Sequence, residues 1–458
     1  MNDSYTLKWS CNHSHEETFQ GRVDRITIYL QSKVLEIIDS NDSVFYLIYF
    51  KNNVLGGGSL QSIYEETFLH KAFQQGMTIH ASHPLFSAFL PKNHTIHIPE
   101  KSDVFTHLQN HLSLTEISLA ATYMDNFMEE SQLVSVIRRI FNHFKQNGQL
   151  AKAYEIAKIL LTFSPNIKAM QEMIRIPAFE KYRKADDSPL LMESFYYQNR
   201  TELNYERQLH QLLHKQSRHL EQLLLFMNLF EVKHDFDDYN AFTHLLERQL
   251  KPEDRYKTLQ FLCEHSTTYS PLSQHLVQEM IYLKQYPEAL SFLITHFSDL
   301  SLDDTTMIEV IIEHVEPSYI VRLPAINQII SSLYRTQPEK KEVLVRRLVT
   351  CLLTQSEPPQ VKEWIEPIRS TSPRLPVVKD IEQLTSLSQD LDQLTRLGEL
   401  YYQFGLLDQS IESFTWEMEL KPDELGPVRW LSKLYKEKGM NEEANTYKNL
   451  SIHMAKRA

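Results

Sequence analysis

Glycine is scarce in this chain and is missing from most of its middle. Ten glycines occur in 458 residues, where an average composition would supply about 32. None falls between Gly148 and Gly398. Doubly wound nucleotide-binding folds need glycine at strand-to-helix turns, and β-sandwiches need it in tight turns. The middle of the chain is therefore predicted to consist of helices joined by short polar or proline-containing turns.

Composition and charge exclude several classes of protein. Hydrophobic residues make up 42% of the chain, which is too apolar for general disorder. The net charge is −12, so no basic excess is available to displace counterions from a nucleic acid. No apolar run approaches the ~20 residues that span a bilayer. The first residues lack the pattern of a signal peptide, and the cysteines, Cys11, Cys263 and Cys351, are far apart and odd in number. We expect a cytoplasmic protein that neither binds nucleic acid nor inserts into a membrane.

Residues 1–102 differ from the rest and predict a small α+β domain. A helix is expected from Ser59 to about Gln75, ended by Gly76. The triple glycine at residues 56–58 is interpreted as a flexible turn before this helix. Short runs rich in β-branched residues predict strands over residues 25–30, 33–38 and 44–50, with further strands at 78–80 and 95–98.

An internal repeat of 34 residues is visible at the C-terminal end. Leucine and tyrosine four residues apart place one helix face in a core, glycine suits a tight turn, and a small residue allows two helices to cross closely. The matching pairs are Leu397 with Leu431, Tyr401 with Tyr435, Gly405 with Gly439, and Ser410 with Ala444.

This pattern resembles the tetratricopeptide repeat (TPR) family, in a form typical of bacterial cytosolic proteins. Residues 391–424 and 425–458 form two adjacent units, and residues 134–167 form a third around Gly148. A degenerate fourth unit covers residues 270–303, where Lys284 replaces the turn glycine. The resemblance implies a mainly α fold, an α-solenoid of helical hairpins that each bury their faces against their neighbours.

Four regions are thus expected along the chain. The segment at 354–379 is rich in proline, serine and threonine, and is interpreted as a linker or irregular segment. The regions are a small α+β domain at 1–102, a degenerate TPR-like helical array at 103–353, the proline-rich segment at 354–379, and a C-terminal TPR pair at 380–458.

The resemblance also implies which residues line a concave groove. Arg429, Lys433 and Lys436 share one helix face and could hold a carboxylate or an acidic peptide. The alternative is a solvated basic face on a terminal repeat. Glu399 would repel a carboxylate, so a carboxylate clamp is not predicted. The candidate partner-binding residues are Arg138, Asn142, Lys145, Tyr402, Arg429, Lys433 and Lys436.

Histidine is the remaining candidate for site chemistry. The run Cys11-Asn-His13-Ser-His15 and the pair His80 and His83 could supply metal ligands, but no second cluster at zinc-site spacing accompanies them. They are interpreted as ordinary surface or interface residues. His210, His214 and His219 are predicted to face solvent. No metal, cofactor or catalytic residue is predicted, because no nucleophile with its base is recognisable.

The sequence favours a non-enzymatic scaffold or adaptor that binds a protein or peptide partner, possibly an acidic one, in the groove of a TPR-type solenoid. Two alternatives stay open. One is a peptide-responsive regulatory receptor with a helical N-terminal effector domain. The other is an enzyme with its active site in the N-terminal domain, which rests on the histidine-rich loops and the triple glycine.

Overall fold

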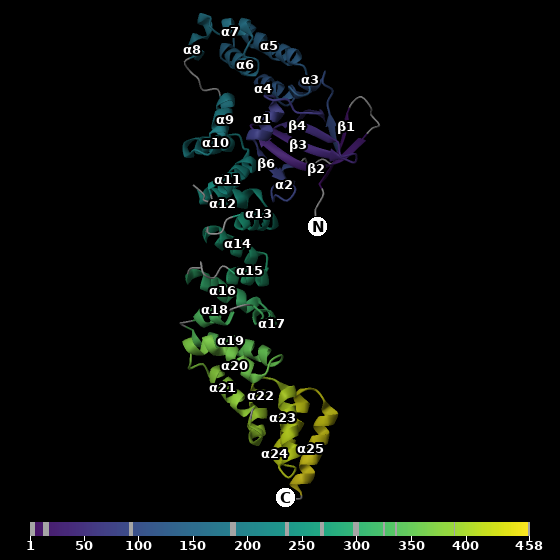
Figure 1. Ribbon diagram of the computed structural model, residues 1–458, viewed down its shortest axis with the longest axis vertical. Helices are drawn as coiled ribbons and strands as arrows, with labels where there is room; N and C mark the ends of the chain where they lie inside the picture. Colours follow the sequence, from purple (N-terminus) through teal and green to yellow (C-terminus); the bar gives the residue numbers. More distant parts are fainter. Residues whose placement is uncertain are drawn as a thin grey trace. The chain divides into compact units, whose positions relative to one another are not determined.

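The chain folds into two compact units, residues 1–272 and residues 273–458. The first unit combines a β-sheet with helices, and the described part of the second is helical (Figure 1). A mostly helical protein with an N-terminal sheet was expected and is confirmed. The computed structural model describes residues 5–11, 18–90, 95–183, 189–233, 238–265, 270–295, 302–323, 326–334, 337–388 and 390–456.

The sheet is larger than the sequence predicts. Its order is β5-β4-β3-β2-β1-β7, and β6 pairs with β2. Among the strand pairs of the described residues, β1 with β7 is parallel and the others are antiparallel. Arg25 stands just after a register shift in β2, beyond which β2 pairs with β6 as well as β3. The strands are β1 Thr6–Cys11, β2 Thr18–Tyr29, β3 Ser32–Asp39, β4 Val44–Phe50, β5 Asn53–Ser59, β6 Met77–His80 and β7 Thr95–Ile98.

The prediction of a flexible turn at the triple glycine is wrong. All three glycines lie in β5, paired with β4. A Cβ atom on Gly57 would lie 2.4 Å from the carbonyl oxygen of Tyr46, so glycine is needed here for close backbone approach rather than for a turn. The following helix begins at Phe68, not at Ser59.

In the first unit α1 and α2 lie between the last three strands of the chain, and the other helices follow β7. The pair α5 and α6 is the third predicted repeat unit. These helices are α1 Phe68–Gln75, α2 Phe86–Phe89, α3 Val104–Leu108, α4 Leu114–Ala121, α5 Glu130–Gln146, α6 Leu150–Phe163, α7 Lys168–Met173, α8 Glu180–Arg183, α9 Pro189–Gln198, α10 Leu203–Lys215, α11 His219–Lys233, α12 Tyr239–Gln249 and α13 Pro252–His265, with 3₁₀ turns at Thr122–Met124 and Pro177–Phe179.

A buried ion cluster joins the sheet to the helices of the first unit. The Arg218 guanidinium, whose side chain is only 9% exposed, is hydrogen-bonded to the carboxylates of Glu193 and Glu221 and to the carbonyl oxygen of Leu30. Leu30 lies in the β2–β3 turn, and the adjacent Gln31 donates to Glu193 at 3.1 Å. The cluster therefore fixes one end of the sheet to the helices α9 and α11.

Asp125 connects the 3₁₀ turn after α4 to the start of α1, and its titration gives a pH test of the fold. Its carboxylate accepts the Phe68 N–H, with N···O distances of 2.9 and 3.1 Å. Burial raises the pKa of Asp125 from 3.8 to about 6 against this hydrogen bond. Because the folded pKa lies above the unfolded one, the associated stability is complete below pH 3.8 and is lost as the pH rises to about 6.

As the pH rises from about 4 to 6, the free energy of local opening of α1 should fall by about 3 kcal/mol in wild type relative to Asp125→Asn. Asparagine keeps an acceptor for the Phe68 N–H but does not titrate. Hydrogen exchange of the α1 amides across this range measures the difference. A pH-independent difference would mean that Asp125 has an ordinary pKa.

The second unit is a succession of helices, of which the last four, α22 to α25, pack in sequence (Figure 1). The helices are α14 Ser270–Tyr282, which begins at the end of the first unit, α15 Tyr286–Thr295, α16 Leu302–His314, α17 Pro317–Ile320, α18 Ile326–Ser332, α19 Pro338–Leu353, α20 Pro358–Thr371, α21 Pro376–Leu387, α22 Leu394–Gln403, α23 Leu407–Leu420, α24 Leu425–Glu437 and α25 Asn441–Ala455, with a 3₁₀ turn at Leu391–Gln393.

The proline-rich segment at 354–379 is helical, so the expected irregular structure there is wrong. Pro358 and Pro376 stand in the first turns of α20 and α21, where a missing N–H costs nothing. The Val377 N–H at the start of α21 donates to the Glu342 carboxylate at 3.1 and 3.2 Å. Pro367 lies inside α20 without ending it. Pro358 and Pro376 thus mark helix starts rather than a linker.

Five helical hairpins share one turn geometry. In each, a residue with positive φ follows the first helix, and the next N–H donates to the carbonyl five residues back at 2.8–2.9 Å. A helix end that is closed by backbone hydrogen bonds in this way favours glycine at the positive-φ position. Two hairpins use another residue there, one of them α10–α11, which the sequence did not reveal. The turn residues are Gly148, Ser217, Lys284, Gly405 and Gly439.

Lys284→Gly is expected to stabilise the α14–α15 hairpin by about 0.5–1 kcal/mol, because Lys284 adopts a φ of 60° that glycine reaches without strain. Urea unfolding of the full chain measures the change. Lys340→Gly, at an exposed position inside α19, is the control and should destabilise by about 1 kcal/mol. Equal losses in both variants would show that the turn at Lys284 is not strained.

Candidate partner-binding groove

A basic groove lies between the last two helices. It is a hollow of about 460 Å³ lined by both helices, and its cations are Arg429, Lys433 and Lys436 from α24 and Lys448 from α25. The turn at Gly439, with a φ of 83°, sets the two helices antiparallel and so brings Lys448 to the predicted stripe. The other lining residues are Ser432, Asn441, Ala444, Asn445 and Ser451.

The groove carries positive charge that the described part of the chain does not neutralise. Its lining holds four cations and no described carboxylate. None of the four forms an ion pair with another described residue. Like charges at this helical spacing destabilise a helix by about 0.2–0.5 kcal/mol per pair. In a chain of net charge −12, this local excess favours an anionic ligand.

Tyr402 does not line this groove, although it was predicted with the groove residues. Its hydroxyl donates to the Glu437 carboxylate at 3.0 Å. The Lys433 ammonium lies over the rings of Tyr402 and Trp430, 4.1 and 4.4 Å from their centroids. Tyr402 therefore positions Lys433 from the neighbouring helix α22.

The other three predicted residues lie on α5, in the first unit. Arg138 and Asn142 are exposed, and the Lys145 ammonium lies 3.2 Å from the sulfur of Met173. A larger hollow, of about 1200 Å³, adjoins the next face of α5 and includes Arg139 and His143 in its lining. Arg138, Asn142 and Lys145 do not line it.

Sequence reasoning missed Lys448 and Asn445 as groove residues. Both belong to the second helix of the last hairpin, whereas the family resemblance directs attention to the first helix. The signal was nevertheless present, because Lys448 stands where the repeat pattern has an aromatic residue, as the preceding unit has Phe414. A charged residue at a position where the repeat normally buries an aromatic one indicates that this position is not covered by another helix.

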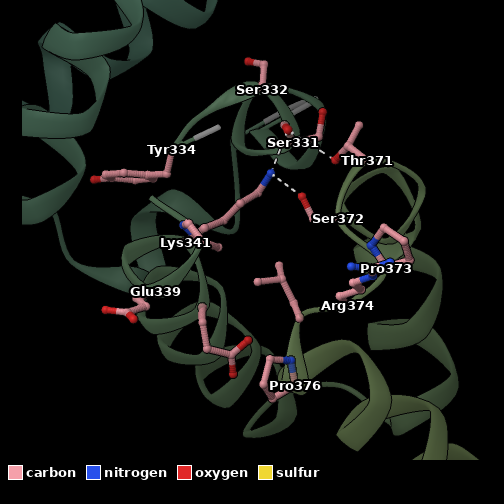
Figure 2. Close-up of a pocket in the computed structure, with 13 residues that line it drawn as sticks. Ser331, Ser332, Tyr334, Glu339, Lys341, Thr371, Ser372, Pro373, Arg374 and Pro376 are labelled. Atoms are coloured by element: carbon pink, nitrogen blue, oxygen red, sulfur yellow. Dashed lines mark hydrogen bonds between the residues drawn. The ribbon is translucent and has the colours of Figure 1, made fainter. Parts of the chain in front are cut away.

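A third hollow, of about 930 Å³, lies where the ends of α18 and α20 meet the starts of α19 and α21 (Figure 2). Its best-defined polar group is the Lys341 side chain, which is buried. The ammonium donates to the Ser331 carbonyl at 2.8 Å and to the Ser372 hydroxyl at 2.9 Å (Figure 2). Lys341 thus connects two helix ends across the hollow and serves packing.

The histidine predictions have mixed outcomes. His13 and His15 lie outside the described residues. The His83 ring packs on Phe261, with centroids 5.0 Å apart. His210 was predicted to face solvent, and this is wrong, because its side chain is 12% exposed and stacks on Phe226 at 3.9 Å. Among described residues, no group of three or more His, Cys, Asp or Glu could hold a metal ion.

Comparisons with known proteins place the chain in no family. No family model and no curated protein matches it. A solved structure of a MamA RS-1 ArsTM double mutant is 13% identical, over 48% of this chain and 96% of that one, with a TM-score of 0.15. The structure of Naa15/Naa10 bound to HypK-THB is 10% identical, over 78% of this chain and 61% of that one, with a TM-score of 0.20. These scores are too low to support an argument about fold or function.

None of the described helices is both long and apolar enough to cross a bilayer.

Proposed function

We propose that this chain is a non-enzymatic, cytoplasmic scaffold that binds an acidic segment of a partner protein through its C-terminal hairpins. The observation that carries the proposal is the groove of α24 and α25, where four cations face one hollow without a described carboxylate. Charge-assisted hydrogen bonds from Arg and Lys to carboxylates supply the binding energy. The groove is formed by rigid helices, so little ordering cost opposes binding.

We further propose that the hairpins are TPR-like and stack as an α-solenoid within each unit. The shared turn supports this, since Gly148, Ser217 and Lys284 occupy the same position in the hairpins α5–α6, α10–α11 and α14–α15. They are separated by 69 and 67 residues, close to twice the 34-residue spacing of Gly405 and Gly439. A repeat that keeps its turn while losing its glycine explains the glycine-free middle of the chain.

The receptor alternative has lost its main support. It needs a helical effector domain at the N-terminal end, whereas the described residues before α3 form a seven-stranded sheet with two short helices. The enzyme alternative rests on the histidine-rich loops and the triple glycine. The triple glycine lies in β5, and His13 and His15 lie outside the described residues.

Charge reversal in the groove is expected to weaken the binding of an acidic peptide by about 30–100-fold, or about 2–3 kcal/mol, because two charge-assisted contacts become repulsive. The variant is Arg429→Glu with Lys433→Glu. The probe is a fluorescein-labelled, glutamate-rich peptide of about 18 residues, titrated into the full chain and followed by fluorescence anisotropy.

The control for this experiment is Lys362→Glu with Lys379→Glu, which makes the same change in net charge on α20 and α21. It should bind the peptide as wild type does. If both double variants lose affinity equally, the peptide responds to net charge and the groove is not its site.

A further inference from the structure

The hairpin before the groove shows what this kind of surface receives. On α22 and α23, Phe414 is fully buried, and α24 covers it, with the Trp430 ring stacked on the Phe414 ring at 5.2 Å and an interplanar angle of 8°. Leu407 and Ile411 pack into the same core, together with Leu431 and Leu434 of α24. The docking surface of the α22–α23 hairpin is thus occupied by a helix.

The groove on α24 and α25 is the equivalent surface one repeat later. Seven residues of the α22–α23 hairpin, among them Phe414, Leu407 and Ile411 of the core with α24, have a groove residue 34 positions later. Gly398 corresponds to Ser432, Tyr402 to Lys436, Leu407 to Asn441, Ser410 to Ala444, Ile411 to Asn445, Phe414 to Lys448, and Glu417 to Ser451.

At the helix crossing of both hairpins a serine hydroxyl donates to a backbone carbonyl of the other helix, from the second helix in α22–α23 and from the first helix in α24–α25. Ser410 donates to the Gly398 carbonyl at 2.8 Å, and Ser432 donates to the Ala444 carbonyl at 2.9 Å. The residues at both crossings are small, so the two helices of each hairpin approach closely. The last hairpin is therefore shaped to receive a helix as its predecessor does, but with cations and amides where the predecessor is apolar.

We propose that this groove binds an acidic amphipathic helix of a partner protein, packed on α24 and α25 as α24 packs on α22 and α23. The inference rests on the proposed function and specifies the form of the ligand. Carboxylates of the helix pair with Arg429, Lys433, Lys436 and Lys448. Its short apolar residues lie over Ala444 and the aliphatic stem of Lys448.

Two peptides of equal composition distinguish recognition of a helix from recognition of negative charge alone. Both have about 18 residues, glutamate on one face, and leucine at i, i+3, i+4 and i+7. One carries its two prolines at its N-terminal end, where a helix tolerates them, and the other carries them in the middle, where they break it. We expect the helical peptide to bind the full chain at least tenfold more tightly, and to gain helical circular dichroism on binding.

Filling the groove without changing its charge provides the structural control. Asn445→Trp places a large side chain on the exposed lining of the groove and should weaken the helical peptide at least tenfold. Asn449→Trp, exposed on α25 outside the lining, should leave binding unchanged.

Each outcome decides between the two proposals. Equal affinity of the two peptides, still lost in Arg429→Glu/Lys433→Glu, overturns the helix inference and leaves the proposed function intact. Binding of neither peptide overturns both proposals. Sedimentation showing that the free chain self-associates, with loss of association in Asn445→Trp, overturns the inference in favour of a second copy of the chain as the occupant.

Discussion

Arg218→Met is expected to lower the free energy of unfolding of the first unit by about 3–5 kcal/mol, because it leaves buried carboxylates without their cation. Glu193 is 1% exposed and cannot recover hydration in place. The carbonyl oxygen of Leu30 loses its guanidinium donor as well. Urea unfolding measures the loss, and Arg207→Met, at an exposed position on α10, is the control, with an expected change within about 0.5 kcal/mol.

The same variant should show a specific pH dependence. Burial already raises the pKa of Glu221 in the presence of Arg218, and removing the cation raises the native-state pKa of Glu221 further. Protonation then removes the buried negative charge. The loss of unfolding free energy in Arg218→Met, relative to wild type, should therefore become smaller as the pH falls from about 8 to 5. A deficit that is the same at both pH values would mean that lost packing, not charge, causes it.

Phe414→Ala is expected to destabilise the C-terminal hairpin pair by about 3–5 kcal/mol. Phe414 is fully buried, stacks on Trp430 of the next helix, and touches Gly398, where a Cβ atom would lie 2.7 Å from its ring. Truncation removes this contact between the two hairpins and leaves a cavity that the rigid helix crossing cannot close. Hydrogen exchange of the α22–α25 amides, read by mass spectrometry, measures the loss locally.

Trp416→Ala is the matched control for this prediction. Trp416 lies two residues away on α23, but its side chain is 55% exposed, so its truncation should cost less than about 1 kcal/mol. Similar losses in the two variants would contradict the packing of α24 on α22–α23, and with it the equivalence between Phe414 and Lys448.

The turns show how far the sequence predicts this fold. Gly148, Gly405 and Gly439 all adopt positive φ, as expected from their place between two periodic helical segments. Ser217 adopts the same conformation but could not be recognised, because serine is common in many local structures. The turn is held by backbone hydrogen bonds, and these have no sequence signature where glycine is replaced.

Proline and glycine were misread where their neighbours decide their role. Pro358 and Pro376 each occupy the first position of a helix, and at α21 the Glu342 carboxylate accepts the Val377 N–H in the first turn. Gly57 lies in a strand because the neighbouring strand approaches closely. Proline and glycine are both common in turns. Composition alone therefore favoured a linker at the prolines and a loop at the triple glycine.

Contacts between residues distant in sequence lay beyond prediction. Arg218 contacts Leu30, 188 residues away, and no local pattern points to this pair. The groove was half predictable, because the stripe of Arg429, Lys433 and Lys436 lies on one helix. Lys448 joins it only through the hairpin, so the shape of the groove needed the structure.

Hydrogen exchange of the full chain, with and without the helical acidic peptide, tests the central claim most directly. We expect slower exchange confined to α24 and α25, strongest around the groove and absent in Arg429→Glu/Lys433→Glu. Protection that lies outside these two helices, or that persists in the double variant, would contradict the claim that the last hairpin binds an acidic partner.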